Sequence, residues 1–331
     1  MNKYIGHPSQ ICCVEEVSLL RGKGKGMTLL NIRNGLGLEL TLSADRAMDI
    51  SRLSYGGSNM GYFAPCGYVA PSYYDNKGTG FLKSFTAGFL TTCGLCAVGS
   101  PCIDEGEELP LHGTLSNTPC ESYCTVEDEE SIFVEAEVRD AALFGRQLIL
   151  HRQYVISKLC NKIRIFDTVE NVGNSTSPCM LLYHFNMGYP LLSENAKLYI
   201  PAKSVSARNE HAAKDIDNCR VIEKPQVGYE ERCYYYDVSE TDDGIASVGI
   251  FNPDISKGLM LSYSKDTLDS FVEWKMMGEY EYVLGLEPAN CTPDGRDVMR
   301  KEGKLKFIEP GERYETELTL YFSDSQSDIE L

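Results

Sequence analysis

The stretch Leu181–Pro190, LLYHFNMGYP, begins as a buried β-strand and ends as a turn. Its first residues are apolar, and Asn186, Gly188 and Pro190 are residue types that end strands. His184 lies inside the apolar run, where a strand leaves the core. Because histidine gains and loses a proton near neutral pH, this position favours acid–base chemistry. The competing interpretation, a hydrogen-bonded structural histidine, is the commoner role for a single strand-end imidazole.

Strand patterns continue on both sides of this stretch. Lys162–Val169 alternates apolar and charged residues, which is typical of a strand with one buried face. Asn34-Gly35 separates two such segments and predicts a tight hairpin turn. Helical periodicity is nearly absent. We therefore expect an all-β fold, a single domain over residues 1–331 built as one large antiparallel β-sandwich. The predicted strands are 27–33, 36–42, 132–138, 147–156, 162–169, 181–187, 233–238, 246–251, 259–263, 271–274, 282–286, 304–308 and 314–322.

Residues 60–120 differ from the rest of the chain. They are rich in Gly, Pro, Tyr and Cys and show little periodicity, apart from a short apolar piece at Phe89-Leu90. Long irregular segments inside compact domains usually carry function. We expect an irregular excursion that covers a cleft, with Tyr73, Tyr74 and Thr92 shaping its selectivity.

Composition excludes several classes of partner. The 331 residues carry a formal net charge of −17 without a Lys/Arg cluster, so the surface repels nucleic acid and anionic membranes. The first residues lack a secretory h-region, and no apolar run reaches the roughly 18 residues of a membrane span. Thirteen cysteines, an odd number at irregular spacing, favour reduced thiols. We expect a cytoplasmic protein. A homodimer is compatible with the sequence, which does not specify the oligomeric state.

Three ionisable residues share one local pattern: an apolar segment precedes each, and turn-forming residues follow. They are His112 in LPLHGT, His184, and Glu287 in LGLEPAN. A carboxylate at a buried strand end is partly desolvated, which raises its pKa and makes it a better base. A glutamate before Pro-Ala-Asn is more often a turn residue, but the shared pattern favours a common site.

Other candidates are weaker. Cys93 and Cys96 have the spacing of two zinc ligands, but no second pair follows, so packing is the expected role and no metal is predicted. Arg46 and Asp49 could form a surface ion pair or a buried pair that faces a ligand. Trp274, followed by Lys275, could be core or a platform for a sugar ring.

The motifs resemble a known family. In order, DRAMDI (45–50), LTTCGL (90–95), LHGTLSNTP (111–119), YHFNMGYPLL (183–192) and YVLGLEP (282–288) are similar to the DUF4432 branch of the aldose 1-epimerase, or galactose mutarotase-like, superfamily. The similarity spans about residues 25–322. It implies a β-supersandwich with few short helices and a carbohydrate ligand.

The resemblance also implies roles for individual residues. His184 would be the acid that protonates the ring oxygen, Glu287 the base that takes the anomeric proton, and His112 would bind the sugar. Substrate contacts are further expected from Arg46, Asp49, Thr92, Asn186, Trp274 and Lys275, with no cofactor. The chain departs from mutarotases where their arginine-containing segment stands, which is occupied here by Thr91–Gly94, and Arg46 is the candidate replacement.

The implied activity is that of an isomerase that interconverts the anomers of a sugar or sugar derivative. Two other classes stay open. One is a non-catalytic carbohydrate-binding protein on the same fold. The other is a carbohydrate lyase or hydrolase; a hydrolase would need a second carboxylate, for which Asp49 and Asp294 are the candidates.

Overall fold

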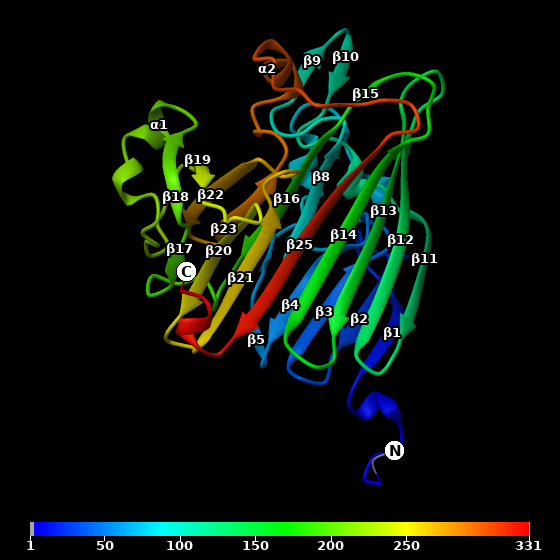
Figure 1. The fold of residues 1–331 in the computed structure, drawn as a ribbon, viewed down its shortest axis with the longest axis vertical. Coiled ribbons are helices and arrows are strands. Elements are labelled where there is room, and N and C mark those ends of the chain that lie inside the picture. The colour runs from blue at the N-terminus through cyan, green and yellow to red at the C-terminus, as the bar shows by residue number, and fades with distance from the viewer. Residues whose placement is uncertain (1–2, 331) are drawn as a thin grey trace.

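A computed structural model of the chain describes residues 3–330, which form a two-layered β-structure (Figure 1). One layer is an eight-stranded antiparallel sheet, in which β25 runs near the middle. Its order is β11 (Cys120–Glu127), β12 (Ser131–Ala141), β13 (Gln147–Ser157), β14 (Lys162–Asn171), β25 (Arg313–Ser323), β21 (Lys257–Ser264), β20 (Ile245–Asn252) and β17 (Lys197–Tyr199).

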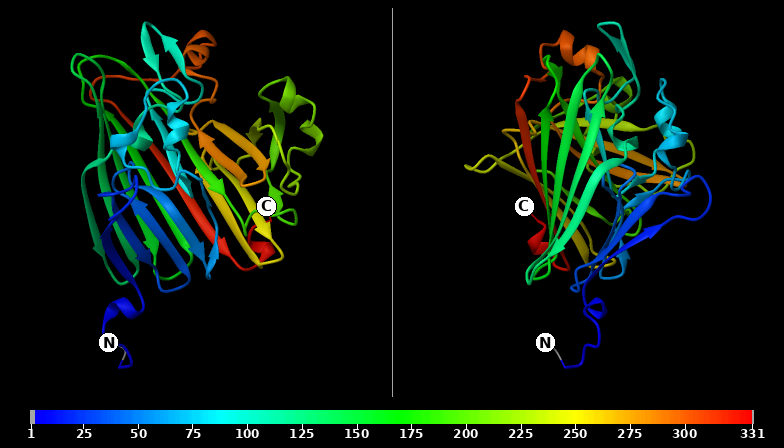
Figure 2. Two further views of the ribbon diagram at one scale, coloured as in Figure 1. Left: turned by 180° about the vertical axis from the view of Figure 1, so that it is seen from behind. Right: turned by 90° about the vertical axis from the view of Figure 1, so that its right-hand side faces the viewer.

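The opposite layer consists of two sheets. The five-stranded sheet contains β1 (Cys13–Ser18), β2 (Thr28–Arg33), β3 (Leu38–Ser43), β4 (Asp49–Tyr55) and β5 (Ser58–Asn59). The six-stranded sheet has the order β18 (Ala202–Ala207), β19 (Arg232–Val238), β22 (Ser270–Gly278), β23 (Glu281–Ala289), β16 (Met180–Met187) and β8 (Leu90–Leu95). The second view in Figure 2 shows the blue strands of the five-stranded sheet packed against the green strands of the eight-stranded one.

Short elements complete the fold. Two-stranded ribbons pair β6 (Tyr62–Phe63) with β7 (Ala87–Gly88), β9 (Cys102–Asp104) with β10 (Glu107–Leu109), and β15 (Ser177–Pro178) with β24 (Phe307–Ile308). The α-helices are α1 (Glu210–Ala213) and α2 (Arg296–Lys301), and short 3-10 turns include η3 (Gly80–Lys83). No helix between residues 3 and 330 has the length and apolar character needed to cross a membrane.

The predicted strands of both sandwich layers are confirmed, because their alternation reflects real burial. In β12, for example, Ile132, Val134, Ala136 and Val138 are buried while the residues between them are not. The strand predicted at 304–308 is reduced to the two residues of β24.

The prediction of an irregular excursion is wrong for Leu90–Leu95. These residues form β8, a fully buried edge strand of the six-stranded sheet that pairs with β16. Both faces of this strand are covered, so its sequence shows no apolar–polar alternation. Its Thr, Cys and Gly residues also do not form the continuous apolar run that would indicate a buried strand. The rest of 60–120 contains short ribbons and 3-10 turns. Phe85 contacts His184 on the six-stranded sheet, whereas Tyr68 is hydrogen-bonded to Ser51 of β4 in the five-stranded sheet.

A buried polar network joins the two layers. Arg152 of β13 donates to both carboxylate oxygens of Asp167, to Asp49 Oδ1 of β4 at 2.7 Å and to the Thr92 hydroxyl of β8 at 2.8 Å. Tyr183 of β16 donates to Asp167 at 2.7 Å. The network places Thr92, Asp49 and Tyr183 on the interior faces of their strands. Because strand neighbours point to opposite faces, His184 must point outward.

Candidate active site

Strand register brings His184 and Glu287 together on the outer face of the six-stranded sheet. Strands β16 and β23 pair antiparallel, with Leu182 opposite Ala289 and Phe185 opposite Leu286. The same register puts His184 opposite Glu287. The His184 Nε2 and Glu287 Oε1 atoms are 3.2 Å apart. Both side chains are almost fully buried, at 6% and 2% exposure.

The pocket above this pair has a volume of about 320 Å³. Its floor is the sheet, and its walls come from loops 79–85, 99–101 and 111–112 together with Arg208 and Glu231. Trp274 lies on β22, opposite Gly285 of β23, and the His184 ring meets the indole edge to face at 5.2 Å. The lining residues are Thr79, Phe81, Leu82, Phe85, Gly99, Ser100, Pro101, Leu111, His112, His184, Arg208, Glu231, Cys233, Trp274, Glu287 and Pro293.

His112 reaches the pocket from a constrained turn. Its backbone has a φ of +59°, a left-handed conformation that is rare for a residue other than glycine. The turn is held by hydrogen bonds from Leu111 N to Gly78 O and from His112 N to Gly99 O. The imidazole lies 5.8 Å from that of His184, measured between ring centroids. Backbone strain of this kind concentrates at functional sites.

Burial moves the pKa values of all three residues towards the neutral forms. It lowers the pKa of His112 to about 4 and that of His184 well below its usual 6.5. Desolvation raises the pKa of Glu287 well above 4.5, against the opposing effect of Arg208. Buried imidazole and carboxyl groups lose hydration that the charged forms need most. At neutral pH burial therefore favours an uncharged imidazole at His184 and a protonated carboxyl group at Glu287.

Several buried polar atoms at this site lack a hydrogen-bond partner among the described residues. They are Nδ1 of His112, Nδ1 of His184, Oδ1 of Asn186 and Oε1 of Glu287. Unpartnered buried polar atoms are costly and uncommon. Their concentration around one pocket indicates a place where a polar ligand supplies the missing bonds.

Of the other expected contacts, only Trp274 joins His112, His184 and Glu287 in the lining. Asn186 lies on the same sheet face, opposite Gly285, and its amide donates to the His184 carbonyl at 2.9 Å. It therefore supports His184 from beside the pocket.

Arg46, Asp49, Thr92 and Lys275 do not line the pocket. Asp49 and Thr92 belong to the interior network with Arg152. Arg46 is buried, and its Nη1 donates to Val69 O at 3.3 Å. Lys275 follows Trp274 and so points to the opposite face of β22, where Nζ lies 2.8 Å from Glu223. Its adjacency to Trp274 along a strand excludes a shared site.

Sequence reasoning missed Arg208, the one Lys or Arg side chain that lines the pocket among residues 3–330. It donates to Ser100 Oγ at 2.8 Å, to Pro293 O at 3.0 Å and to Asp294 Oδ1 at 3.2 Å. The segment around it is polar and shows no periodicity, so no signal distinguished it. Glu231, which accepts a hydrogen bond from the Trp274 indole at 2.7 Å, was missed for the same reason.

The described residues contain no group of three or more His, Cys, Asp and Glu side chains placed to hold a metal ion. Cys93 and Cys96, the pair with zinc spacing, are free and buried in separate apolar clusters. Both thiols therefore lie among apolar side chains in the structure.

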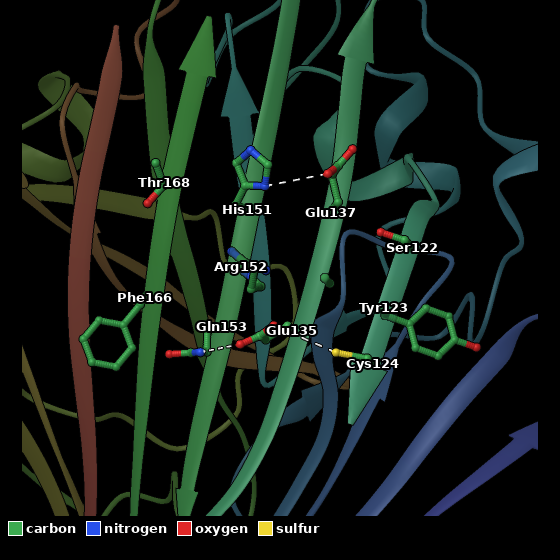
Figure 3. A pocket seen from close by; sticks show the side chains of 11 residues that line it. Ser122, Tyr123, Cys124, Glu135, Glu137, His151, Arg152, Gln153, Phe166 and Thr168 are labelled. Atoms are coloured by element: carbon green, nitrogen blue, oxygen red, sulfur yellow. Dashed lines mark hydrogen bonds and ion pairs between the residues drawn. The ribbon is translucent and has the colours of Figure 1, made fainter. Parts of the chain in front are cut away.

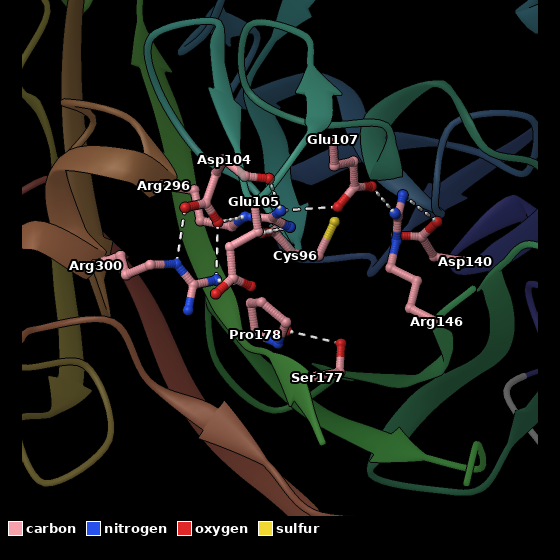
Figure 4. Close-up of polar contacts among 10 residues, drawn as sticks. All are labelled: Cys96, Asp104, Glu105, Glu107, Asp140, Arg146, Ser177, Pro178, Arg296 and Arg300. Atoms are coloured by element: carbon pink, nitrogen blue, oxygen red, sulfur yellow. Dashed lines mark hydrogen bonds and ion pairs between the residues drawn. The ribbon is translucent and has the colours of Figure 1, made fainter. Parts of the chain in front are cut away.

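Two larger hollows lack the features of the His184 pocket. One, of about 520 Å³, is an open depression on the outer face of the eight-stranded sheet, where His151 lies beside Glu137 (Figure 3). The other nitrogen of the His151 ring lies 3.5 Å from Glu170. The other, of about 730 Å³, adjoins α2 and the β9–β10 ribbon. There Asp104 binds Arg296 and Arg300, and Glu107 binds Arg296 and Arg146, so the charges satisfy one another (Figure 4).

Solved structures of similar fold cover nearly the whole chain. A Klebsiella pneumoniae protein, provisionally named an aldose 1-epimerase, matches with a TM-score of 0.88 and 23% identity, over 95% of this chain and 84% of that one. A galactose mutarotase-like protein from Clostridium acetobutylicum matches with a TM-score of 0.70 and 13% identity, over 96% and 100%. Galactose 1-epimerase from Lactobacillus acidophilus matches with a TM-score of 0.64 and 13% identity, over 94% and 99%.

These likenesses show a galactose mutarotase-like fold. No curated protein matches the sequence. One family model, a domain of unknown function termed DUF4432, matches residues 24–322. The chain therefore belongs to the DUF4432 family.

Proposed function

We propose that the protein is an aldose 1-epimerase-like isomerase, which interconverts the anomers of a sugar at the His184–Glu287 pair. The observation that carries the proposal is the 3.2 Å separation of His184 Nε2 and Glu287 Oε1 at the floor of a pocket with unpartnered polar atoms. Opening a hemiacetal requires one proton donor and one acceptor within hydrogen-bond reach of two oxygens on the same carbon. An imidazole and a carboxyl group 3.2 Å apart can fill these two roles.

In the proposed reaction, His184 gives a proton to the ring oxygen while Glu287 takes the proton of the anomeric hydroxyl. The C1–ring oxygen bond breaks and the C1=O bond forms. Rotation about C1–C2 presents the other face of the aldehyde, and the reverse transfers close the ring. Both groups return to their starting protonation states, so protons and electrons balance. The steps are proton transfers throughout and call for no cofactor.

Burial favours the neutral form of the pair, in which Glu287 holds the proton. Transfer of that proton to Nε2 over 3.2 Å gives the imidazolium–carboxylate form that acts as acid and base. His112 and Trp274 would bind the sugar ring, the latter through its apolar face. Arg208 would supply the positive charge for which Arg46 was the sequence-based candidate.

Saturation-transfer NMR on a panel of aldoses tests the activity. Wild-type protein should accelerate exchange between α and β anomer signals, and His184→Asn should lower the catalysed rate by about 10²-fold, a typical contribution of one proton-transfer group. Sugar binding, read from the fluorescence of the single tryptophan, Trp274, should persist in the variant. A wild-type protein without catalysed exchange on any aldose would refute the isomerase proposal.

The alternatives give other results in the same assay. A carbohydrate-binding protein would change Trp274 fluorescence without accelerating exchange. A hydrolase would release new sugars, and would need a second carboxylate beside Glu287. Asp49 is in the interior network and Asp294 is bound by Arg208, so the second carboxylate in the pocket lining is Glu231.

Gly285→Ala should reduce kcat because Gly285 leaves the space in which the Glu287 carboxyl lies. A Cβ there would overlap Glu287 Oε1 and would lie 3.0 Å from Trp274 Cβ. The carboxyl is the flexible end of a side chain, so it should move while the fold persists. Displacement of a catalytic group by about 1 Å can cost up to about 10²-fold. We expect a 10- to 100-fold lower kcat by NMR exchange.

The matched control is Gly6→Ala, whose Cβ would meet only Gln10 Oε1, at 3.5 Å. It should leave kcat unchanged. If Gly285→Ala kept wild-type kcat, the position of the Glu287 carboxyl would not be critical for the reaction.

A further inference from the structure

A second compartment adjoins the pocket above His184 and Glu287. This compartment has a volume of about 430 Å³ and shares Leu82, Phe85, Glu231 and Trp274 with the first. Its other lining residues are Tyr62, Ala64, Pro65, Cys66, Met276, Glu281 and Val283. Each compartment alone is within the size range of small-molecule sites, roughly 300–1,000 Å³.

The two compartments lie along one face of one sheet. Residues Glu287, Gly285 and Val283 alternate on β23, so their side-chain positions share a face, as do those of Trp274 and Met276 on β22. Glu287 and Val283 are four positions apart, which corresponds to about 13 Å along a strand. The residues that line the two adjoining compartments therefore span a length greater than that of a single six-membered sugar ring.

The lining of the second compartment suits the apolar face and the hydroxyl groups of an uncharged sugar. Met276, Val283, Ala64 and Pro65 form apolar walls, and the indole of Trp274 is fixed by its hydrogen bond to Glu231. Carboxylates Glu231 and Glu281 can accept hydrogen bonds from hydroxyl groups. Flat apolar surface together with a few polar groups that fix orientation is typical of small-molecule sites.

The charges disfavour an anionic substituent. No Lys, Arg or His of the described chain lines the second compartment, whereas Glu231 and Glu281 do. In the first compartment, Arg208 is paired with Asp294 and Glu231 is close by. A phosphate or uronate group in the second compartment would meet Glu231 and Glu281 without a cation to pair with.

We propose that the second compartment binds a second, uncharged sugar unit, so that the substrate class is a neutral reducing disaccharide. The proposal rests on the proposed function for the position of the reacting ring. The anomeric carbon at His184 and Glu287 must carry a free hydroxyl, so the second unit is attached through another carbon of that ring. Leu82, Phe85, Glu231 and Trp274 contact the substrate at the junction of the two units.

Isothermal titration calorimetry and anomer-exchange NMR on the same samples test whether the second compartment binds a second sugar unit. The probes are maltose, cellobiose and lactose, compared with glucose, galactose and glucose 6-phosphate. We expect at least one disaccharide to bind tenfold or more tightly than the monosaccharides, and glucose 6-phosphate to bind most weakly. Ala64→Phe and Met276→Phe each fill the second compartment and should remove most of the disaccharide advantage. Val126→Phe, a bulky change at an exposed position of β11, should retain it.

The two readouts separate this proposal from the proposed function. Equal affinity for disaccharides and monosaccharides, a preference for glucose 6-phosphate, or an advantage that survives both filling variants would overturn the second compartment as a sugar subsite. Tight disaccharide binding without anomer exchange would support the subsite and refute the isomerase. Release of monosaccharides would also support the subsite and would assign hydrolysis instead.

Discussion

Replacing Arg152 by methionine should lower the free energy of unfolding by about 3–5 kcal/mol, the usual result of removing one partner from a buried ion pair. The Arg152 side chain is fully buried and its guanidinium is the partner of two carboxylates, Asp49 and Asp167, which are 6% and 0% exposed. The variant would leave both carboxylates in the interior without their cation. For a chain of this size, the loss corresponds to a fall in Tm of roughly 10 °C.

Thermal and urea unfolding, followed by circular dichroism, measure this effect. Arg164→Met on the neighbouring strand is the matched control. Arg164 pairs with Glu317 at 2.7 Å, but both side chains are 46% exposed, so its loss should cost at most about 1 kcal/mol. Adding Asp49→Asn and Asp167→Asn to Arg152→Met should recover part of the stability, because the unpaired charges are removed. If Arg152→Met cost no more than Arg164→Met, the network would not join the layers energetically.

The network also illustrates what local sequence patterns can and cannot predict. Strands such as Lys162–Val169 can be predicted from the sequence because one face is exposed to solvent and the other is buried. The sequence around Thr92 in β8 does not alternate between apolar and polar residues, since both faces of that strand are buried. Asp49 and Arg152 are more than a hundred residues apart, and only the packing of two layers brings them together.

In the candidate site, too, some features could be predicted from local sequence patterns and others could not. His184 and Glu287 could be singled out because each is an ionisable residue in an apolar segment, although β16 continues beyond His184 to Met187 instead of ending there. Their contact depends on the register between β16 and β23, which no local pattern specifies. Lys275 was assigned to the site because it follows Trp274, although adjacent strand residues face opposite ways. Arg208 directly follows β18. The sequence of β18 is polar, so neither the strand nor the position of Arg208 could be predicted from it.

Glu287→Gln should lower the rate of anomer exchange by about 10²–10⁴-fold and at the same time stabilise the protein above about pH 4.5. Glutamine keeps the shape of the side chain but can neither take nor give the proton. The gain in stability follows from the raised pKa of Glu287, whose charged form is disfavoured by burial. Functional groups held in apolar sites commonly cost stability in this way.

The sign of the pH dependence follows from proton linkage. Between 4.5, the usual pKa of glutamate, and the raised pKa of folded Glu287, the folded protein keeps a proton that the unfolded chain has released. Wild-type stability therefore falls as pH rises through this window, by about 1.4 kcal/mol per pH unit at most. Glutamine does not titrate, so it contributes no such pH dependence to the stability of the variant. His184, whose lowered pKa makes stability fall as pH drops below 6.5, is present in both proteins and largely cancels.

Urea unfolding from pH 4 to pH 9 measures the difference in the free energy of unfolding between Glu287→Gln and the wild type. This difference should be near zero at the acid end, grow as the pH rises above 4.5, and become constant once folded Glu287 is ionised. Glu129→Gln, in an exposed turn, should follow the wild type throughout. A Glu287→Gln protein less stable than wild type at pH 8 would mean that the ionised carboxylate is stabilised where it lies. The pair would then hold its proton on His184, and the neutral resting form derived from burial would be incorrect.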